Sequence, residues 1–222
     1  MVGQKNGTNA KDVQRILGLG SYNSAWLWLH KIRTAMVRLE TEKLSGIIEI
    51  DEAFLGKSIP GKRGRGAKEI KVVVAVELGD KKLGRIRIKH IKDCSSATLH
   101  EFIKDKVEKG SKIITDDWNG YKGIEKEGYI HEVIQMETNE ELPHVHLVIS
   151  LLKRWLLGTM HGSYSKKYFS SYLNEFVFRF NRRTSKKRGL LFYRLMETAV
   201  KKPPLTLEKL KVKEKRVALD QK

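Results

Sequence analysis

The sequence has one cysteine, few acidic residues and no long apolar run, and each shortage excludes a class of protein. A single cysteine, Cys94, excludes an intramolecular disulfide framework and a cysteine-based zinc site within the chain. No apolar run approaches the roughly 18 to 20 residues that span a bilayer. The first ten residues also lack the apolar core of a signal peptide. We therefore expect a cytoplasmic protein with no membrane partner.

The second shortage is of negative charge. The 222 residues include 26 Asp and Glu against 44 Lys and Arg, which gives a formal net charge of +18 at pH 7. A basic excess of this size favours a polyanionic partner, because neutralised phosphates release counterions. Nucleic acid is the first candidate and a membrane surface the second. The hydrophobic content of 40% suffices for one sizeable core, so we expect one domain with appendages.

The hydrophobic pattern predicts an α/β domain after residue 44. Three segments alternate in polarity or are rich in β-branched residues, which indicates three consecutive strands, most simply paired as a meander. They are residues 47–54, 69–78 and 84–91. A helix over 95–110, a buried strand at 112–115, a fifth strand over 129–136 and a helix over 143–158 follow. This order is that of a ribonuclease-H-like fold, a mixed sheet flanked by helices.

The segment before this domain predicts two short helices. Residues 11–17 and 21–36 have helical spacing, are separated by a Gly-containing turn, and offer Ser21 or Asn23 as the cap of the second helix. They suggest a helix-turn-helix whose second helix reads DNA with Lys31 and Arg33. The alternative is a helical pair that only packs on the main domain.

The expected division of the chain has three parts: a partial helix-turn-helix region at 1–43, a catalytic domain at 44–200 and a basic C-terminal tail at 201–222.

Two carboxylates mark the expected catalytic site. Asp51 lies in the middle of the first strand and Asp116 follows the fourth, and these positions are neighbours in a ribonuclease-H-like sheet. The two carboxylates of such a pair repel each other unless a divalent cation lies between them. We therefore expect two magnesium or manganese ions and phosphodiester chemistry. Asp51 is preferred because it shares a strand face with Glu49, and Asp116 because it directly follows the strand. Glu52 and Asp117 remain alternatives.

A third metal ligand is expected from the helix over 143–158, which contains no Asp or Glu. The candidates are His144, His146 and Ser150. His146 and Lys153 are seven residues apart and share a helix face, so His146 would meet the metal or the scissile phosphate while Lys153 holds a DNA phosphate. The alternative is a partly buried histidine beside a solvated lysine.

Further DNA contacts are predicted at basic residues elsewhere. Residues 56–68 form a Gly-rich loop that either follows a phosphate backbone or is a solvated connection. The candidate phosphate contacts outside the first two helices are Lys62, Arg63, Arg65, Lys153, Arg154, Arg182 and Arg183.

Five motifs together resemble one family. They are IDEAFLG at 50–56, GRGAK at 64–68, TDDWNGY at 115–121, HVHLVISLLKRWLLGTMHG at 144–162 and YLNEFVFRFNRR at 172–183. The combination is similar to the bacterial insertion-sequence transposases of the IS1595 family, with an ISXO2-like, DDE-type transposase domain. The similarity extends over about residues 11–200.

The resemblance implies roles for individual residues. Asp51 and Asp116 fall on the family's first two catalytic aspartates, and Lys153 falls on its lysine. His146 stands where many members have the third metal-binding residue, Glu. Members usually begin with a cysteine-rich zinc ribbon that is missing here, so we expect an N-terminally shortened copy.

The implied function is DNA transposition. A transposase of this type would cleave phosphodiesters at insertion-sequence ends and transfer the strand to target DNA, acting on double-stranded DNA as a homo-oligomer. Two alternatives stay open: a non-catalytic DNA-binding remnant or regulator, and a nuclease of the same fold that cuts without joining.

Overall fold

A computed structural model describes residues 7–37, 42–56, 70–79, 82–134, 142–160 and 164–210. The strands are β1 (Ile47–Leu55), β2 (Ile70–Leu78), β3 (Leu83–Ile91), β4 (Lys112–Thr115) and β5 (Ile130–Val133). The α-helices are α1 (Ala10–Ile16), α2 (Tyr22–Ala35), α3 (Ser96–Lys106), α4 (Pro143–Met160), α5 (Phe169–Phe180) and α6 (Arg188–Val200). Short 3₁₀ turns η1 (Asn119–Tyr121), η2 (Ile124–Glu127) and η3 (Lys166–Tyr168) complete the described elements.

The five strands form one mixed sheet in the order β3-β2-β1-β4-β5. β1, β2 and β3 pair antiparallel as the predicted meander, while β4 pairs parallel to β1 and β5 parallel to β4. This order and these directions are those of a ribonuclease-H-like sheet, so the predicted fold class is confirmed.

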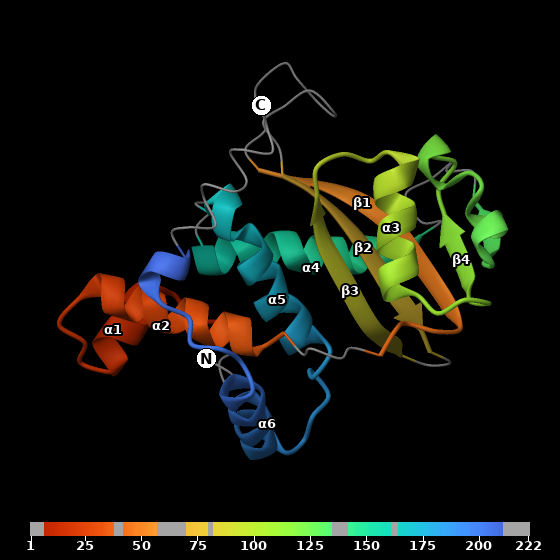
Figure 1. Cartoon of the computed structure of the whole chain (residues 1–222). Helices are drawn as coiled ribbons and strands as arrows, with labels where there is room; N and C mark the ends of the chain where they lie inside the picture. The colour runs from red at the N-terminus through yellow and green to blue at the C-terminus, as the bar shows by residue number, and fades with distance from the viewer. Residues whose placement is uncertain are drawn as a thin grey trace.

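Helices cover both faces of the sheet (Figure 1). Because side chains alternate along a strand, β1 directs Ile48 and Ile50 into the core beneath α3, and directs Ala53 and Leu55 into the core beneath α4 and α5. The polar members of β1 follow the same alternation. Glu49 and Asp51 are therefore on the side of α4.

The two predicted N-terminal helices are present. Ser21 is the N-cap of α2, and its hydroxyl accepts a hydrogen bond from the backbone N–H of Asn23. α2 packs against α5 and α6, with Ala35, Met36 and Phe178 in a small separate core. The helical pair is thereby fixed to the C-terminal helices (Figure 1).

Two helix ends differ from the sequence prediction. α3 ends at Lys106 rather than at Gly110, because Val107 leaves the helix to form a parallel bridge with Leu44. α4 continues past Gly158 to Met160, since a glycine within a helix costs only about 1 kcal/mol relative to alanine. None of the described helices is both long and apolar enough to cross a membrane.

Candidate active site

The parallel pairing of β1 with β4 brings the two predicted aspartates together. The register pairs Glu49 with Ile114. Two residues further along the same strands, Asp51 comes beside Asp116 at the end of β4. The negative charge of Asp116 acts on the carboxyl group of Asp51. The neighbouring Asp117 is exposed to solvent.

Burial controls the ionisation of Asp51. It is the largest cause of a pKa raised from 3.8 to about 6, and the negative charge of Asp116 acts in the same direction. A hydrogen bond of 2.7 Å from the backbone N–H of Glu52 and the nearby imidazole of His146 act in the opposite direction. The two carboxylates therefore form an electrostatically unfavourable pair, which a cation between them would relieve.

α4 places one of the three candidate third ligands at this pair. Nε2 of His146 lies 3.3 Å from Oδ2 of Asp51. His144 contacts Glu49 instead, and Ser150 is exposed one turn further along the helix. His146 is thus the candidate that the fold brings to Asp51.

Glu49 fixes the start of α4 and was not assigned this role from sequence. Its Oε2 accepts hydrogen bonds from the backbone N–H groups of His144 and Val145 at 3.0 and 2.8 Å, and its Oε1 lies 2.6 Å from Nδ1 of His144. The carboxylate of a buried strand residue therefore caps the helix, where negative charge is also favoured by the helix dipole. The available signals were an acid on the same strand face as Asp51 and a helix that begins at proline without an acidic cap of its own.

The loop after β4 is held in one conformation. The backbone N–H of Trp118 donates to Oδ1 of Asp116 at 3.1 Å, and its indole N–H donates to the carbonyl of Cys94 at 3.0 Å. A Cβ on Gly120 would lie 2.8 Å from that carbonyl oxygen, so the close approach requires glycine. These contacts orient Asp116 toward the site.

Glu52 is on the opposite face of β1 from Asp51, where it neighbours Tyr121. Burial raises the pKa of the Tyr121 phenol well above its ordinary value, and the negative charges of Glu52, Asp51 and Asp116 add to the effect. The phenol therefore stays protonated beneath the carboxylate pair.

The donor set fits a divalent metal ion of the magnesium type. Across the described residues, no group of three or more His, Cys, Asp or Glu side chains is arranged so that it could hold a metal ion. What the fold provides is an open pair of hard oxygen donors, Asp51 and Asp116, with the His146 imidazole beside Asp51. Carboxylate oxygens suit magnesium and manganese, and their mutual repulsion favours a cation at this place.

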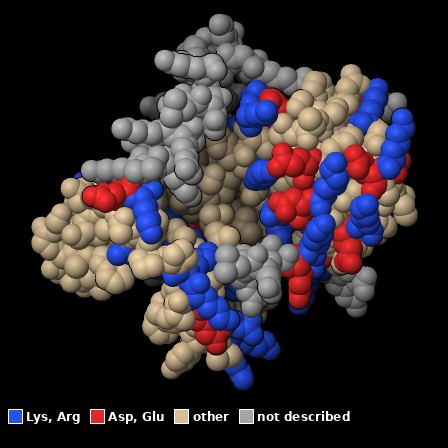
Figure 2. All heavy atoms as spheres, in the orientation of Figure 1, with Lys and Arg blue, Asp and Glu red and all other residues tan. Residues whose placement is uncertain are grey.

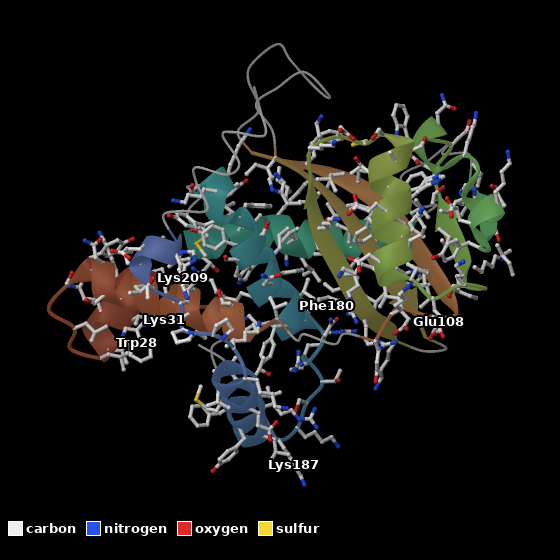
Figure 3. The ribbon with its side chains drawn as sticks, viewed as in Figure 1. Trp28, Lys31, Glu108, Phe180, Lys187 and Lys209 are labelled. Atoms are coloured by element: carbon white, nitrogen blue, oxygen red, sulfur yellow. The ribbon has the colours of Figure 1, made fainter. Side chains whose placement is uncertain are left out.

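Arg33 is not on an exposed, DNA-reading face of α2 as predicted. Its side chain is buried, and Nε donates a hydrogen bond of 2.8 Å to Oε2 of the fully buried Glu175. Arg33 therefore faces the protein interior and joins α2 to α5. Lys31 is exposed, with its ammonium 5.6 Å from the ring centroid of the exposed Trp28, and both lie on α2 (Figure 3).

The other predicted DNA contacts fall in different settings. Lys153 and Arg154 are exposed on α4. Arg182 stacks on Phe178 and donates to its carbonyl oxygen, and Arg183 donates to the carbonyl oxygens of Phe180, Gly84 and Leu83. The side chains of both arginines are thus engaged in contacts within the protein at the end of α5.

Lys62, Arg63 and Arg65 lie outside the described residues. On the face shown in Figure 2, the described Lys and Arg side chains over the sheet and α3 are mixed with Asp and Glu, while α1 and α2 carry few charges.

Comparison with known proteins places the chain in a family. The family model for the ISXO2-like transposase domain matches residues 43–181. A search of curated protein sequences gives no significant match. The chain is also similar in structure to the catalytic core domain of BIV integrase, with 13% identity, a TM-score of 0.42 and coverage of 69% of this chain and 95% of that chain.

A second similar structure is the Mos1 strand transfer complex, with 9% identity, a TM-score of 0.39 and coverage of 89% of this chain and 72% of that chain. A third is the simian T-cell lymphotropic virus intasome in complex with the PP2A regulatory subunit B56 gamma, with 12% identity, a TM-score of 0.36 and coverage of 73% and 59%. The family match covers more than half of the sequence, and the chain belongs to the family of ISXO2-like DDE transposase domains.

Proposed function

We propose that this protein is a DNA transposase that cleaves phosphodiesters at insertion-sequence ends and joins the freed strand to target DNA. The observation that carries the proposal is the position of Asp51 beside Asp116 on the α4 side of the sheet, with His146 of α4 in contact with Asp51. Membership of the DDE transposase family supports the same reaction class. Double-stranded DNA is the proposed partner, and a homo-oligomer on DNA is the proposed active form.

Asp51 and Asp116 would hold two divalent ions, with His146 as the third ligand or as a group that orients the scissile phosphate. Bound magnesium or manganese supplies activation of the attacking oxygen and stabilisation of the leaving oxygen. In cleavage, a water oxygen attacks phosphorus at the element end and a 3′-hydroxyl leaves. In joining, the oxygen of that 3′-hydroxyl attacks phosphorus in a phosphodiester of the target, the P–O3′ bond of the target breaks, and the target strand leaves with a free 3′-hydroxyl.

The chain's own residues position the DNA in this scheme. Lys153 and Arg154 are exposed on α4, two turns beyond His146, and can bind phosphates of the strand that enters the site. Glu49 holds the first turn of α4 and thereby sets the position of His146. The net charge of +18 supplies the attraction to DNA that does not depend on sequence.

A second candidate function is a non-catalytic DNA-binding protein derived from a transposase. The imidazole of His146 at the expected third metal-ligand position favours this candidate. Among the described residues, no group of three or more His, Cys, Asp or Glu side chains could hold a metal ion. This candidate predicts DNA that is bound but never cut. A nuclease of the same fold would give cut DNA without joined product.

The test is a strand-transfer assay with a labelled duplex from the DNA that flanks the coding region, in magnesium and in manganese. Asp51→Asn and Asp116→Asn should lose joined product and keep salt-sensitive DNA binding. Asp117→Asn is the matched control, because it removes the same charge one residue away on an exposed side chain. Joined product from either of the first two variants would refute the assignment, and bound but uncut DNA with the native chain would favour the second candidate.

A further inference from the structure

A cavity of about 330 Å³ lies where the first two helices meet the end of α4 and the side of α5. One face of α2 supplies Tyr22, Trp26, Leu29 and Arg33, at spacings of four, three and four residues. Met160 closes the cavity from α4 and Tyr172 from α5. Its volume is within the range of small-molecule sites in proteins.

The lining combines aromatic rings with positive charge. Tyr22, Trp26 and Tyr172 provide three ring faces or edges, and the guanidinium of Arg33 lies 4.7 Å from the ring centroid of Tyr172. Lys11 adds a second cation at the exposed rim. Among the described lining residues there is no carboxylate. This chemistry suits a ligand with a flat ring and a negative group.

The charged residues next to the cavity also favour an anionic ligand. Glu175 is fully buried and pairs with Arg33 at 2.8 Å, and Nη1 of Arg179 lies 3.9 Å from its other oxygen. Two guanidinium groups thus share one carboxylate. Nη2 of Arg33 has no hydrogen-bond partner among the described residues. The cluster keeps an excess of positive charge that an anionic group would balance.

The cavity is connected to the candidate active site by one helix. α4 runs from His146, at Asp51, to Met160, at the cavity, which corresponds to about 20 Å along the helix axis. Lys153 and Arg154 are exposed between these two points. About six nucleotides of a DNA strand would cover this distance.

We propose that the cavity binds a single unpaired nucleotide of a DNA strand, its base against the aromatic rings and its phosphate near Arg33 and Lys11. The proposal rests on the proposed function, because it assigns the strand to the DNA that the transposase would hold. Unpaired bases stack on aromatic side chains and arginine in this way in proteins that bind single strands.

The experiment is a fluorescence titration with a 12-nucleotide single strand that contains one 2-aminopurine. It uses the full chain carrying Asp51→Asn in EDTA, so that no catalysis contributes. Tyr22→Ala and Lys11→Gln remove rim contacts, and Ala10→Leu narrows the cavity, where Ala10 is part of the lining. The matched controls are Tyr193→Ala on α6 and Lys126→Gln in η2, both exposed and outside the cavity.

The native cavity should give saturable binding that Tyr22→Ala, Lys11→Gln and Ala10→Leu each weaken by about fivefold or more. The controls should bind within about twofold of the parent chain, since stacking and phosphate contacts at the cavity are unchanged. A strand of the same length that is abasic at all twelve positions, measured by competition with the 2-aminopurine strand, should bind as weakly as Tyr22→Ala binds the intact strand.

Two results would overturn the proposed site. One is equal affinity of the parent chain for the abasic and intact strands, and the other is equal affinity of Tyr22→Ala and Tyr193→Ala for the intact strand. Free dAMP that competes as well as the oligonucleotide would assign a free nucleotide and overturn the DNA strand as the source. Absence of saturable binding would also overturn the cavity proposal, and it would leave the proposed strand transfer untouched, because catalysis is disabled in every sample and is tested in the separate strand-transfer assay.

Discussion

His146 lies on the first turns of α4 with Nε2 3.3 Å from Oδ2 of Asp51, at the position where a third metal ligand is expected. An imidazole at this place can serve as a ligand, but it adds no negative charge to the site. Magnesium prefers carboxylate oxygen to imidazole nitrogen. The identity of this residue therefore bears directly on metal affinity.

We expect His146→Glu to increase stabilisation by magnesium. Without metal, a third carboxylate would repel Asp51 and lower the melting temperature. With magnesium, the melting temperature should rise more than it does for the native chain, because a ligand that binds only the folded state stabilises it. Thermal unfolding at several magnesium concentrations measures both effects.

Ser150→Glu is the control for this change, because it adds the same charge on an exposed position one turn away. An equal magnesium effect in His146→Glu and Ser150→Glu would show that position 146 does not face the metal.

Glu49→Gln should weaken the start of α4. The neutral amide keeps an acceptor but loses the charge that receives the N–H groups of His144 and Val145, so we expect a loss of about 1 to 3 kcal/mol in the free energy of unfolding. Urea denaturation measures this loss. Strand transfer should fall as well, since the first turn of α4 also carries His146.

Glu101→Gln serves as the comparison for Glu49→Gln, because Glu101 is exposed and its carboxylate pairs with Lys89 at the surface. We expect its effect on the free energy of unfolding to be much smaller than that of Glu49→Gln, because solvent screens an exposed ion pair. Similar losses of unfolding free energy in the two variants would contradict the assignment of Glu49 as the buried cap of α4.

Arg33→Met should destabilise the protein by about 3 to 5 kcal/mol, because it leaves Glu175 buried with one distant guanidinium group. Adding Glu175→Leu in the same chain should recover much of the loss, since no buried charge then lacks its partner. Urea denaturation of the two single variants and the double variant gives the coupling energy. Additive effects would contradict a structural ion pair.

The free energy of unfolding should decrease in acid because of the buried side chain of His30. Burial, followed by the charges of Arg33 and Lys167, lowers the pKa of His30 from 6.5 to about 3. Below pH 6.5 the unfolded chain therefore binds a proton that the folded chain does not, and the free energy of unfolding falls as pH decreases toward 3. The contribution is limited to about 1.4 kcal/mol per pH unit.

His30→Phe keeps a ring among Trp26, Tyr168 and Tyr172 and removes the titrating group. Its free energy of unfolding should decline less steeply than that of the native chain between pH 6.5 and pH 4. Parallel pH profiles from urea denaturation would contradict the assignment.

Alternation of polar and apolar residues was enough to predict the sheet and the position of Asp51. The period of two placed Ile48 and Ile50 on one face and Asp51 on the other, and the strand order then placed Asp116 beside Asp51. The end of α3 was missed because it depends on the bridge between Val107 and Leu44, which lie far apart in sequence.

Long-range partners account for the other differences. Arg33 has the spacing of an exposed reading helix, but its partner Glu175 is 142 residues away. Glu49 caps a helix that begins almost a hundred residues later. Neither pairing could be assigned from local sequence, because each joins residues that are distant in the chain and adjacent only in the packed fold.

The central claim is that Asp51 and Asp116 together hold a divalent metal ion. Titration with manganese, followed by electron paramagnetic resonance of the free ion, measures this directly. The account predicts saturable binding by the native chain and by Asp117→Asn, and at least about a tenfold loss of affinity in Asp51→Asn and in Asp116→Asn, because each removes one of the two carboxylates of the pair. Binding that is unchanged in both of these variants would contradict it.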